Sequence, residues 1–443
     1  GLMFWSVAEP MYHFTSPPWG EAQTAEAARL AMGVTFFHWG FHAWGLYGLM
    51  ALALAYFAYN KGLPLTVRST FYPLLGERIH GRAGDLIDTL AAVATLFGLA
   101  TSLGLGVAQV AAGMNVLVDT PTTTTFQVIL IAAITGLAVI SVVAGLDKGV
   151  KRLSQFNMAL AALFLLFILI VGPTVFILSG LTQSVGFYIQ NLPELSLWTE
   201  TFRDTNWQGS WTVFYWAWWI SWSPFVGMFI ARVSKGRTVR EFILGVMIVP
   251  TLLSLVWLAA FGGAALNLEV TGAVDLVAAV NADVATALFA MLDGFPLSAV
   301  TSLIGIVLVV VFFVTSSDSG SLVVDHLTSG GKLDSPKPQR VFWAIMEGVI
   351  AAVLLIGGGL TTLQTAAIAT GLPFAIILLF IVWALYVGFR RELVALDAVR
   401  QHAEAVTLRD EFDEHLTDRL PVAPTKAPPA ASSEAATPDR PTS

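Results

Sequence analysis

The sequence WTVFYWAWWISWSPFVGMFIA fills residues 211–231, a run of 21 residues without a charged side chain. At a rise of about 1.5 Å per residue, a helix of this length crosses the roughly 30 Å hydrocarbon layer of a bilayer, so the run predicts a transmembrane helix. Tryptophans at membrane interfaces explain indoles at helix ends, but not those near the middle. Five of the 14 tryptophans of the chain lie in the first 12 residues of this run: Trp211, Trp216, Trp218, Trp219 and Trp222.

A proline follows the tryptophan cluster. Pro224 removes one backbone donor, so the helix is expected to kink or open there and to free backbone groups inside the membrane. Transporters form their midplane sites with such interrupted helices. Indole faces also attract quaternary ammonium groups, which predicts a cation site, whereas simple helix packing is the alternative explanation for the cluster.

The composition places the chain among membrane proteins. Apolar residues make up 56% and charged residues 12% of the sequence, and the mean hydropathy is +0.73. We therefore predict an all-α polytopic membrane protein. The absence of cysteine excludes disulfides and thiolate metal sites. A net charge of −7 gives no footprint for nucleic acid, and the sequence shows no nucleophile, His/carboxylate cluster or nucleotide loop, so we expect no enzyme.

Apolar windows of about 20 residues predict the membrane spans. The first nine residues, 1–9, read as the end of a further span. We expect a transporter core over 1–389, composed of this stub and nine full spans at 27–58, 86–112, 126–146, 156–180, 211–231, 243–266, 298–323, 341–357 and 366–389.

The distribution of basic residues predicts the orientation. The loops at 59–84, 147–154, 232–242 and 327–340 hold 14 lysines and arginines, whereas the alternate loops hold only Arg203. Basic loops lie in the cytoplasm, so the C-terminus is expected there too. The acidic segments 9–24, 183–210 and 267–296, which include Glu9, are then outer loops, and 191–202 reads as an amphipathic surface helix.

The character of the sequence changes after Gly388. Residues 390–418 predict a charged cytoplasmic helix. Residues 419–443 are rich in proline and alanine, which predicts a disordered tail. A cytoplasmic tail could transmit a signal, so an osmosensing membrane receptor is the alternative function from another class.

Two further segments carry side chains suited to binding. FFHWGFHAWGLYG (36–48) contains Trp39, Trp44 and Tyr47, which line a wide helix face at about 100° per residue. His38 and His42 are four residues apart, a spacing that allows a metal site, but no acidic residue is near in sequence and hydrogen bonds within the bundle are the favoured role.

VFFVTSSDSGS (311–321) ends an apolar span with hydroxyls and Asp318. Oxygen ligands suit a hard cation such as sodium. A polar cytoplasmic helix end is the alternative.

WAWWISWSPFVGMF (216–229), followed by ARVSKGRTVREF (231–242), resembles the eighth-helix signature of the betaine/choline/carnitine transporter family. The resemblance covers residues 1 to about 392 and is closest to sodium-coupled glycine betaine carriers. It implies a LeuT-like core of inverted five-helix repeats, lacking its first two and a half helices here, in a bacterial cell (inner) membrane. It also implies a homotrimer.

The resemblance implies roles for individual residues. Aromatic residues form a box around the trimethylammonium group, and others flank its entrance. Gly1 occupies a position where choline carriers commonly have aspartate, so glycine there favours a zwitterion over a cation. The implied substrate-binding residues are Trp39, Trp44, Tyr47 and Trp219 in the box, Trp218 and Trp222 beside it, and Phe4, Phe225 and Gly1.

The resemblance also implies the coupling ion. Thr315 and Ser316 match residues that bind sodium. A second sodium position in close relatives uses two threonines and a phenylalanine, here Thr95 and Phe225, but its second threonine is Leu99, which offers no oxygen. That second site is therefore doubtful, and the role expected for Asp318 is structural.

These observations predict sodium-coupled secondary active uptake of a quaternary-ammonium compatible solute, first glycine betaine, with no cofactor besides the ion. The alternatives are a sodium-independent carnitine/betaine-type exchanger and a choline or ectoine carrier.

Overall fold

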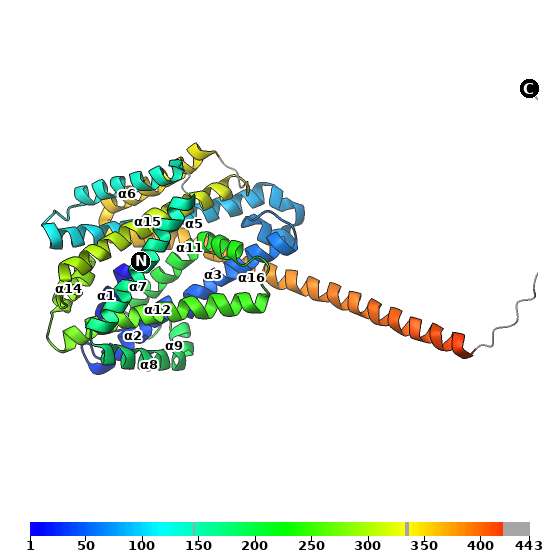
Figure 1. The fold of residues 1–443 in the computed structure, drawn as a ribbon, viewed down its shortest axis with the longest axis horizontal. Helices are drawn as coiled ribbons and strands as arrows, with labels where there is room; N and C mark the ends of the chain where they lie inside the picture. Colours follow the sequence, from blue (N-terminus) through cyan, green and yellow to red (C-terminus); the bar gives the residue numbers. More distant parts are fainter. Residues whose placement is uncertain (145–146, 333–335, 420–443) are drawn as a thin grey trace, which may run out of the picture. The chain divides into compact units, whose positions relative to one another are not determined.

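The computed structural model describes residues 1–144, 147–332 and 336–419, and this part of the chain is helical without a β-strand. It divides into two compact units, Gly1–Tyr386 and Val387–Ser443, which are described separately below. Figure 1 shows the ribbon, in which α5 and α11 lie between α6 and α8.

The helices follow one another through short loops. The long ones are α1 (Leu2–Thr15), α2 (Ala25–Trp39), α3 (Phe41–Ala55), α5 (Arg82–Val118), α6 (Thr124–Ala144), α7 (Asp147–Val171), α8 (Thr174–Gln190), α11 (Thr212–Val233), α12 (Val239–Val270), α15 (Ser298–Thr328) and α16 (Lys337–Arg419). The short ones are η1 (Tyr56–Asn60), η2 (Arg68–Phe71), α4 (Tyr72–Leu75), η3 (Gly76–His80), α9 (Leu192–Leu197), α10 (Trp207–Ser210), α13 (Leu276–Ala282), η4 (Val284–Thr286) and α14 (Ala287–Asp293).

Seven helical stretches of the described residues are long and apolar enough to cross a membrane, fewer than the nine spans expected. The stretch Lys337–His415 contains two expected spans in one element. α11 is not among the seven, because its four tryptophans and two serines lower the hydropathy of its 22 residues.

One predicted span has the wrong end. The window 156–180 crosses a break, because α7 stops at Val171 and α8 begins at Thr174. Gly172 and Pro173 lie between the two helices, and proline cannot donate the backbone hydrogen bond that would continue α7. The stub is also longer than predicted, since α1 continues through Pro10 to Thr15. Glu9 is therefore not in an outer loop but fully buried in α1.

The prediction that α11 opens at Pro224 is wrong. α11 continues as one helix from Thr212 to Val233. Pro224 cannot donate to the carbonyl oxygen of Ile220, one turn earlier, but the hydroxyl of Ser223 donates to that oxygen at 2.7 Å. The side chain thus satisfies the carbonyl that the proline leaves without its usual donor.

The interruptions lie elsewhere. Gly40, with φ −93° and ψ −135°, separates α2 from α3 inside the predicted span 27–58. In α16 the backbone leaves the helical conformation at Gly358 and Gly359, and the φ of +65° at Gly359 is one that glycine adopts without a steric penalty. Two further interruptions, besides the break at Gly172 and Pro173, therefore fall at glycine.

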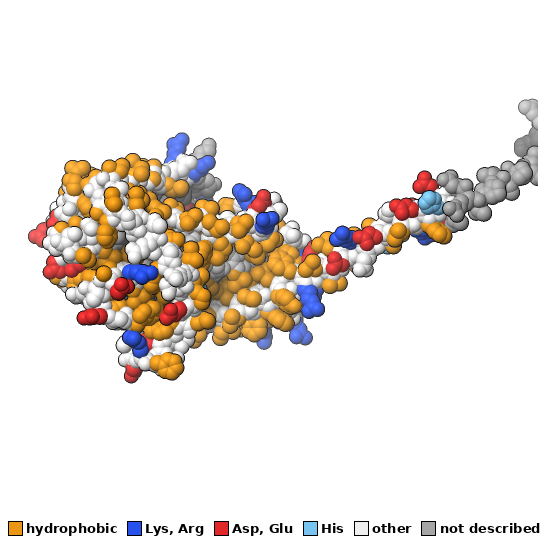
Figure 2. Space-filling model, turned by 90° about the horizontal axis from the view of Figure 1, so that it is seen from below, with side chains coloured by type: hydrophobic (Ala, Val, Ile, Leu, Met, Phe, Trp, Pro, Cys, Tyr) orange, Lys and Arg blue, Asp and Glu red, His pale blue; other side chains and the backbone are white. Residues whose placement is uncertain are grey.

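The surface of the first unit is strongly apolar. Figure 2 shows hydrophobic side chains over most of the visible face, with charged groups confined to a few places. Large apolar side chains are more than half exposed on α6 (Ile129, Ile140), α7 (Met158, Leu163), α12 (Val249, Leu253) and α15 (Val300, Leu303). An apolar exterior of this extent is typical of helices that face lipid.

Two predicted surface segments are partly described. Only Leu192–Leu197 of the expected amphipathic helix 191–202 is helical. In the second unit, the helix continues from Val387 to Arg419, where a charged helix was expected at 390–418, and its side chains are largely exposed as far as residue 415. The expected tail lies beyond Arg419, outside the described residues.

Candidate binding site

A cavity of about 740 Å³ is lined by residues of α1, α2, α3, α5, α7, α11, α12 and α15. Its wall includes eight of the residues expected to bind substrate or sodium, which come from α2, α3, α11 and α15 and from the residue that precedes α1. They are Gly1, Trp39, Trp44, Tyr47, Trp218, Trp219, Trp222 and Ser316. The fold therefore brings together aromatic residues that are about 180 positions apart in the chain.

The four expected box residues form a continuous series of ring contacts. The ring centroids of Trp39 and Trp219 are 4.9 Å apart with planes at 73°, and those of Tyr47 and Trp219 are 6.0 Å apart at 77°. Trp44 lies 5.5 Å from Tyr47 at 75°. Trp218 stacks on Trp219 at 5.0 Å and 12°. Edge-to-face contacts place ring faces at steep angles to one another, as a cage around a rounded cation requires.

The indole N–H groups of the four tryptophans donate hydrogen bonds to protein acceptors. Trp219 Nε1 donates to the carbonyl oxygen of His38 at 2.8 Å, and Trp39 Nε1 donates to Glu9 Oε2 at 2.8 Å. Trp222 Nε1 donates to Gly98 O at 2.9 Å, and Trp218 Nε1 to Ser102 Oγ at 3.1 Å. Because these polar atoms are satisfied by protein partners, the rings present their π-faces to the cavity in fixed orientations.

A buried cluster around Glu9 lies behind the cavity and escaped the sequence analysis. Glu9 Oε1 is 2.6 Å from His38 Nδ1 and 3.3 Å from His13 Nε2. Glu9 Oε2 accepts from Trp39 and from the hydroxyl of Tyr215. Glu9, His13 and His38 are fully buried. The spacing of Glu9 and His13, four residues apart in an apolar stretch, was a signal for this cluster. It was not used because residues 9–24 were assigned to an outer loop.

The ligand atoms of Glu9, His13 and His38 lie within 4.8 Å of one another, close enough to consider a metal ion. Four hydrogen-bond donors already occupy the two carboxylate oxygens, which leaves a hydrogen-bond network as the sufficient explanation. His42 does not join this group: it stacks on Trp216 at 5.2 Å and lies 3.1 Å from Ser196 Oγ. His38 and His42 thus make hydrogen bonds within the bundle, the favoured of the two expectations.

Other candidate residues lie outside the cavity wall. Phe4 is 2% exposed and packs against Trp5 with centroids 4.9 Å apart. Phe225 contacts the edge of Trp222 at 5.4 Å. Thr95 donates to Ala91 O on its own helix at 2.8 Å, while Leu99, one turn later, lines the cavity. The arrangement offers no side-chain oxygen at Leu99 for a second ion.

The hydroxyls expected to bind sodium differ in their surroundings. Ser316 lines the cavity. Thr315 Oγ1 donates to Val311 O and Phe312 O at 3.0 Å each, within α15. Asp318 Oδ1 lies 3.8 Å from Arg340 Nη2. A sodium site at Thr315 and Ser316 stays a prediction.

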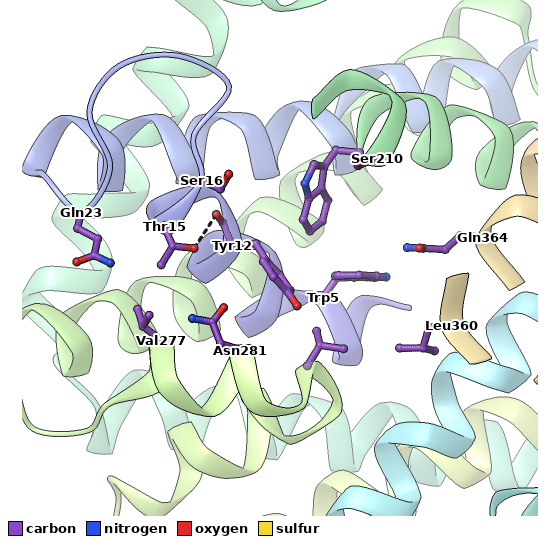
Figure 3. A pocket seen from close by; sticks show the side chains of 12 residues that line it. Trp5, Tyr12, Thr15, Ser16, Gln23, Ser210, Val277, Asn281, Leu360 and Gln364 are labelled. Atoms are coloured by element: carbon purple, nitrogen blue, oxygen red, sulfur yellow. Dashed lines mark hydrogen bonds between the residues drawn. The ribbon is translucent and has the colours of Figure 1, made fainter. Parts of the chain in front are cut away.

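A second cavity of about 700 Å³ was not foreseen from the sequence. Figure 3 shows Trp5 and Tyr12 from α1, Asn281 from α13 and Gln364 from α16 around it. Trp5 contacts Trp211 at 5.5 Å, and both line this cavity.

Comparison with known proteins gives consistent results. The family model of betaine/carnitine/choline transporters (BCCT) matches residues 1–394. A glycine betaine/proline/choline transporter of Vibrio parahaemolyticus is 53% identical over 409 residues, which cover 88% of this chain and 73% of that protein. A glycine betaine transporter of Acinetobacter baylyi is 49% identical over 402 residues, covering 90% and 61%. Glycine betaine transporter 1 of Vibrio parahaemolyticus is 52% identical over 401 residues, covering 88% and 76%.

Proposed function

The chain belongs to the betaine/carnitine/choline transporter family and is a multi-pass membrane protein, and from this premise we propose that it takes up a quaternary-ammonium compatible solute, first of all glycine betaine. One observation carries the proposal. The side chains of Trp39, Trp44, Tyr47 and Trp219 line one cavity in mutual contact.

The chemistry of that cavity favours a methylated ammonium group. A desolvated cation over an aromatic face gains about 2 kcal/mol or more. Trimethylammonium cannot donate a hydrogen bond, so it needs no polar partner from the wall. The name of each relative described above includes glycine betaine, and one also includes proline and choline.

Coupling to sodium forms the second part of the proposal. Thr315 and Ser316 supply hydroxyls on α15, and Ser316 reaches the cavity wall. Oxygen atoms are the ligands that hard cations prefer. Sodium-independent exchange is the competing transport mode, and no separate observation favours it. The relatives are named as transporters, and no catalytic step is proposed.

Membrane orientation and assembly complete the proposal. The 14 basic residues in alternate loops support a cytoplasmic C-terminus. A homotrimer in the bacterial inner membrane is what the family resemblance implies.

The test is uptake of labelled glycine betaine by cells or proteoliposomes that contain the protein, in sodium and in potassium buffer. We expect uptake in sodium that falls to the level of empty vesicles in potassium. Equal uptake in both buffers contradicts sodium coupling and favours exchange. Absence of specific uptake and of betaine binding in either buffer contradicts the assigned substrate.

A further inference from the structure

A second fully buried carboxyl group lies away from the Glu9 cluster. Glu347 sits in the first half of α16, in the apolar sequence VFWAIMEGVIAAVLL (341–355), and none of its side chain is exposed. Its Oε2 accepts a hydrogen bond of 2.6 Å from Ser317 Oγ on α15. Among the described residues Glu347 Oε1 has no hydrogen-bond partner. The group thus has one polar partner, where Glu9 has four.

The unpartnered oxygen lies beside a glycine of α15. A methyl group placed on Gly320 of α15 would lie 3.4 Å from Glu347 Oε1 and 2.6 Å from Cδ1 of Leu99. Oε1 therefore lies against the α15 backbone close to the Leu99 side chain of α5. The glycine leaves space for the carboxyl group, and the leucine offers it no hydrogen bond.

The charged groups nearby do not neutralise Glu347. Asp318 on α15, the residue after Ser317, carries the same sign as an ionised Glu347. Arg340, two turns earlier on α16, pairs with Asp318 at 3.8 Å. The neighbours Leu99 on α5 and Ser317 on α15 are uncharged. An ionised Glu347 would therefore be a desolvated anion with a single hydrogen-bond donor, an unfavourable arrangement inside a membrane.

Two ligands would remove that cost: a proton or a metal cation. A hard metal cation takes about six oxygen ligands. Glu347 and Ser317 supply three, the two carboxyl oxygens and one hydroxyl, and the nearby Leu99 side chain supplies none. A proton needs a single oxygen and no additional ligand. The geometry is therefore that of a site for a proton.

We propose that Glu347 and Ser317 form a proton-binding site directly behind residues that line the aromatic cavity. The carboxylate takes up one proton at Oε1 and becomes the neutral acid, while Oε2 continues to accept from Ser317. Ser317 directly follows Ser316, and both Ser316 and Leu99 line the aromatic cavity. Occupancy of the site acts on the part of α15 that carries the proposed sodium hydroxyls. This consequence for transport rests on the proposed function, whereas the protonation itself does not.

Infrared difference spectroscopy of the purified protein tests the protonation without any transport. We expect the C=O stretch of a protonated carboxyl group in the wild type at neutral pH, its loss as the pH is raised, and its absence from Glu347→Gln. Ser317→Ala removes the hydrogen bond to Oε2 and shifts the band. Glu21→Gln changes an exposed carboxyl group and leaves the band in place. A neutral-pH wild-type spectrum without a band that Glu347→Gln removes overturns the proposal.

Thermal unfolding gives a second readout. The folded protein holds a proton that the unfolded chain releases at neutral pH, so stability falls as the pH rises. As the pH is raised from neutral, the unfolding temperature of the wild type should drop more than that of Glu347→Gln. Parallel curves contradict the proposal. So does stabilisation by sodium over potassium that Glu347→Gln abolishes, since this would assign a sodium ion to the site. Failure of betaine uptake affects neither readout, so the two proposals fail separately.

Discussion

The indole Nε1 of Trp39 donates a hydrogen bond of 2.8 Å to Oε2 of Glu9, 30 residues earlier in the chain. This contact fixes the rotation of a cavity-lining ring by means of a carboxylate that does not itself line the cavity. The same carboxylate accepts from Tyr215 on α11, so one acidic side chain joins three helices behind the aromatic residues.

Replacing a box tryptophan should weaken binding of the solute. We expect Trp219→Ala or Trp39→Ala to lose at least about 1.4–2 kcal/mol, roughly 10–30-fold in Kd, because a cation–π contact is removed. Equilibrium binding of labelled glycine betaine to the purified protein measures the change. Trp383→Ala, which alters a ring that is 57% exposed on α16, is the matched control and should bind as the wild type does. An unaltered Kd for glycine betaine in a folded Trp219→Ala protein would contradict the proposal that these aromatic residues bind the cationic group.

Glu9→Gln should weaken binding without touching the cavity wall. An amide offers one acceptor oxygen and places donors where Glu9 now accepts from four groups, so a buried donor loses its partner. We expect a loss of stability of about 1–3 kcal/mol and a rise in Kd of about tenfold as Trp39 loses its fixed orientation. Thermal unfolding and betaine binding measure the two effects. Glu194→Gln, on an exposed carboxylate, is the control. If Glu9→Gln keeps the stability and affinity of the wild type, the hydrogen bonds to Glu9 do not determine the orientation of Trp39.

The sodium stoichiometry should be one ion per solute, because Leu99 supplies no oxygen for a second. A zwitterion carries no net charge, so each sodium contributes about 2.3 kcal/mol per 100 mV and about 1.4 per tenfold gradient, near 3.7 together. One ion then supports roughly 500-fold accumulation, and two ions would square this ratio. Simultaneous measurement of sodium and betaine fluxes in proteoliposomes gives the ratio. A ratio of two sodium ions per betaine in the wild type would refute the single-ion prediction. Leu99→Thr adds a hydroxyl at this position, so a ratio above one agrees with the prediction only in that variant.

Gly1→Asp should shift the preference from betaine toward choline. Gly1 lines the cavity, and a carboxylate there attracts a net cation but repels the carboxylate of betaine. At an effective dielectric constant near 20 and a separation of about 6 Å, one such pair is worth about 3 kcal/mol. A side chain at this position also meets Trp218, since its Cβ would lie 2.4 Å from Cη2 of that ring. Gly1→Asn therefore serves as the control, because it has the same shape without the charge.

Competition between choline and glycine betaine for binding separates the two effects at Gly1. A greater preference for choline in the aspartate variant than in the asparagine variant is the expected result. Equal preferences in the aspartate and asparagine variants would mean that charge at position 1 does not select the substrate. Glycine would then be required there only because the Trp218 ring lies close to it.

Much of the fold follows from the sequence alone. The apolar windows at 86–112, 243–266 and 298–323 lie inside α5, α12 and α15, because a helix that meets lipid must be apolar over the thickness of the bilayer and this property is local. The aromatic positions Trp39, Trp44, Tyr47 and Trp219 were selected through the family resemblance of their sequence motifs, and the fold places all four at one cavity. Local pattern failed at 156–180, where apolar residues continue across the break at Pro173.

The tertiary structure alone decided the partners of the polar groups. Sequence spacing gave no sign that Glu9 meets His38 and Trp39, or that Glu347 meets Ser317, since each pair is about 30 residues apart and lies on different helices. Hydropathy reports how each residue interacts with lipid or water, and so it predicts which segments enter the membrane. Which donor satisfies which buried acceptor depends on the rotation and crossing of packed helices, and therefore on every contact between them at once.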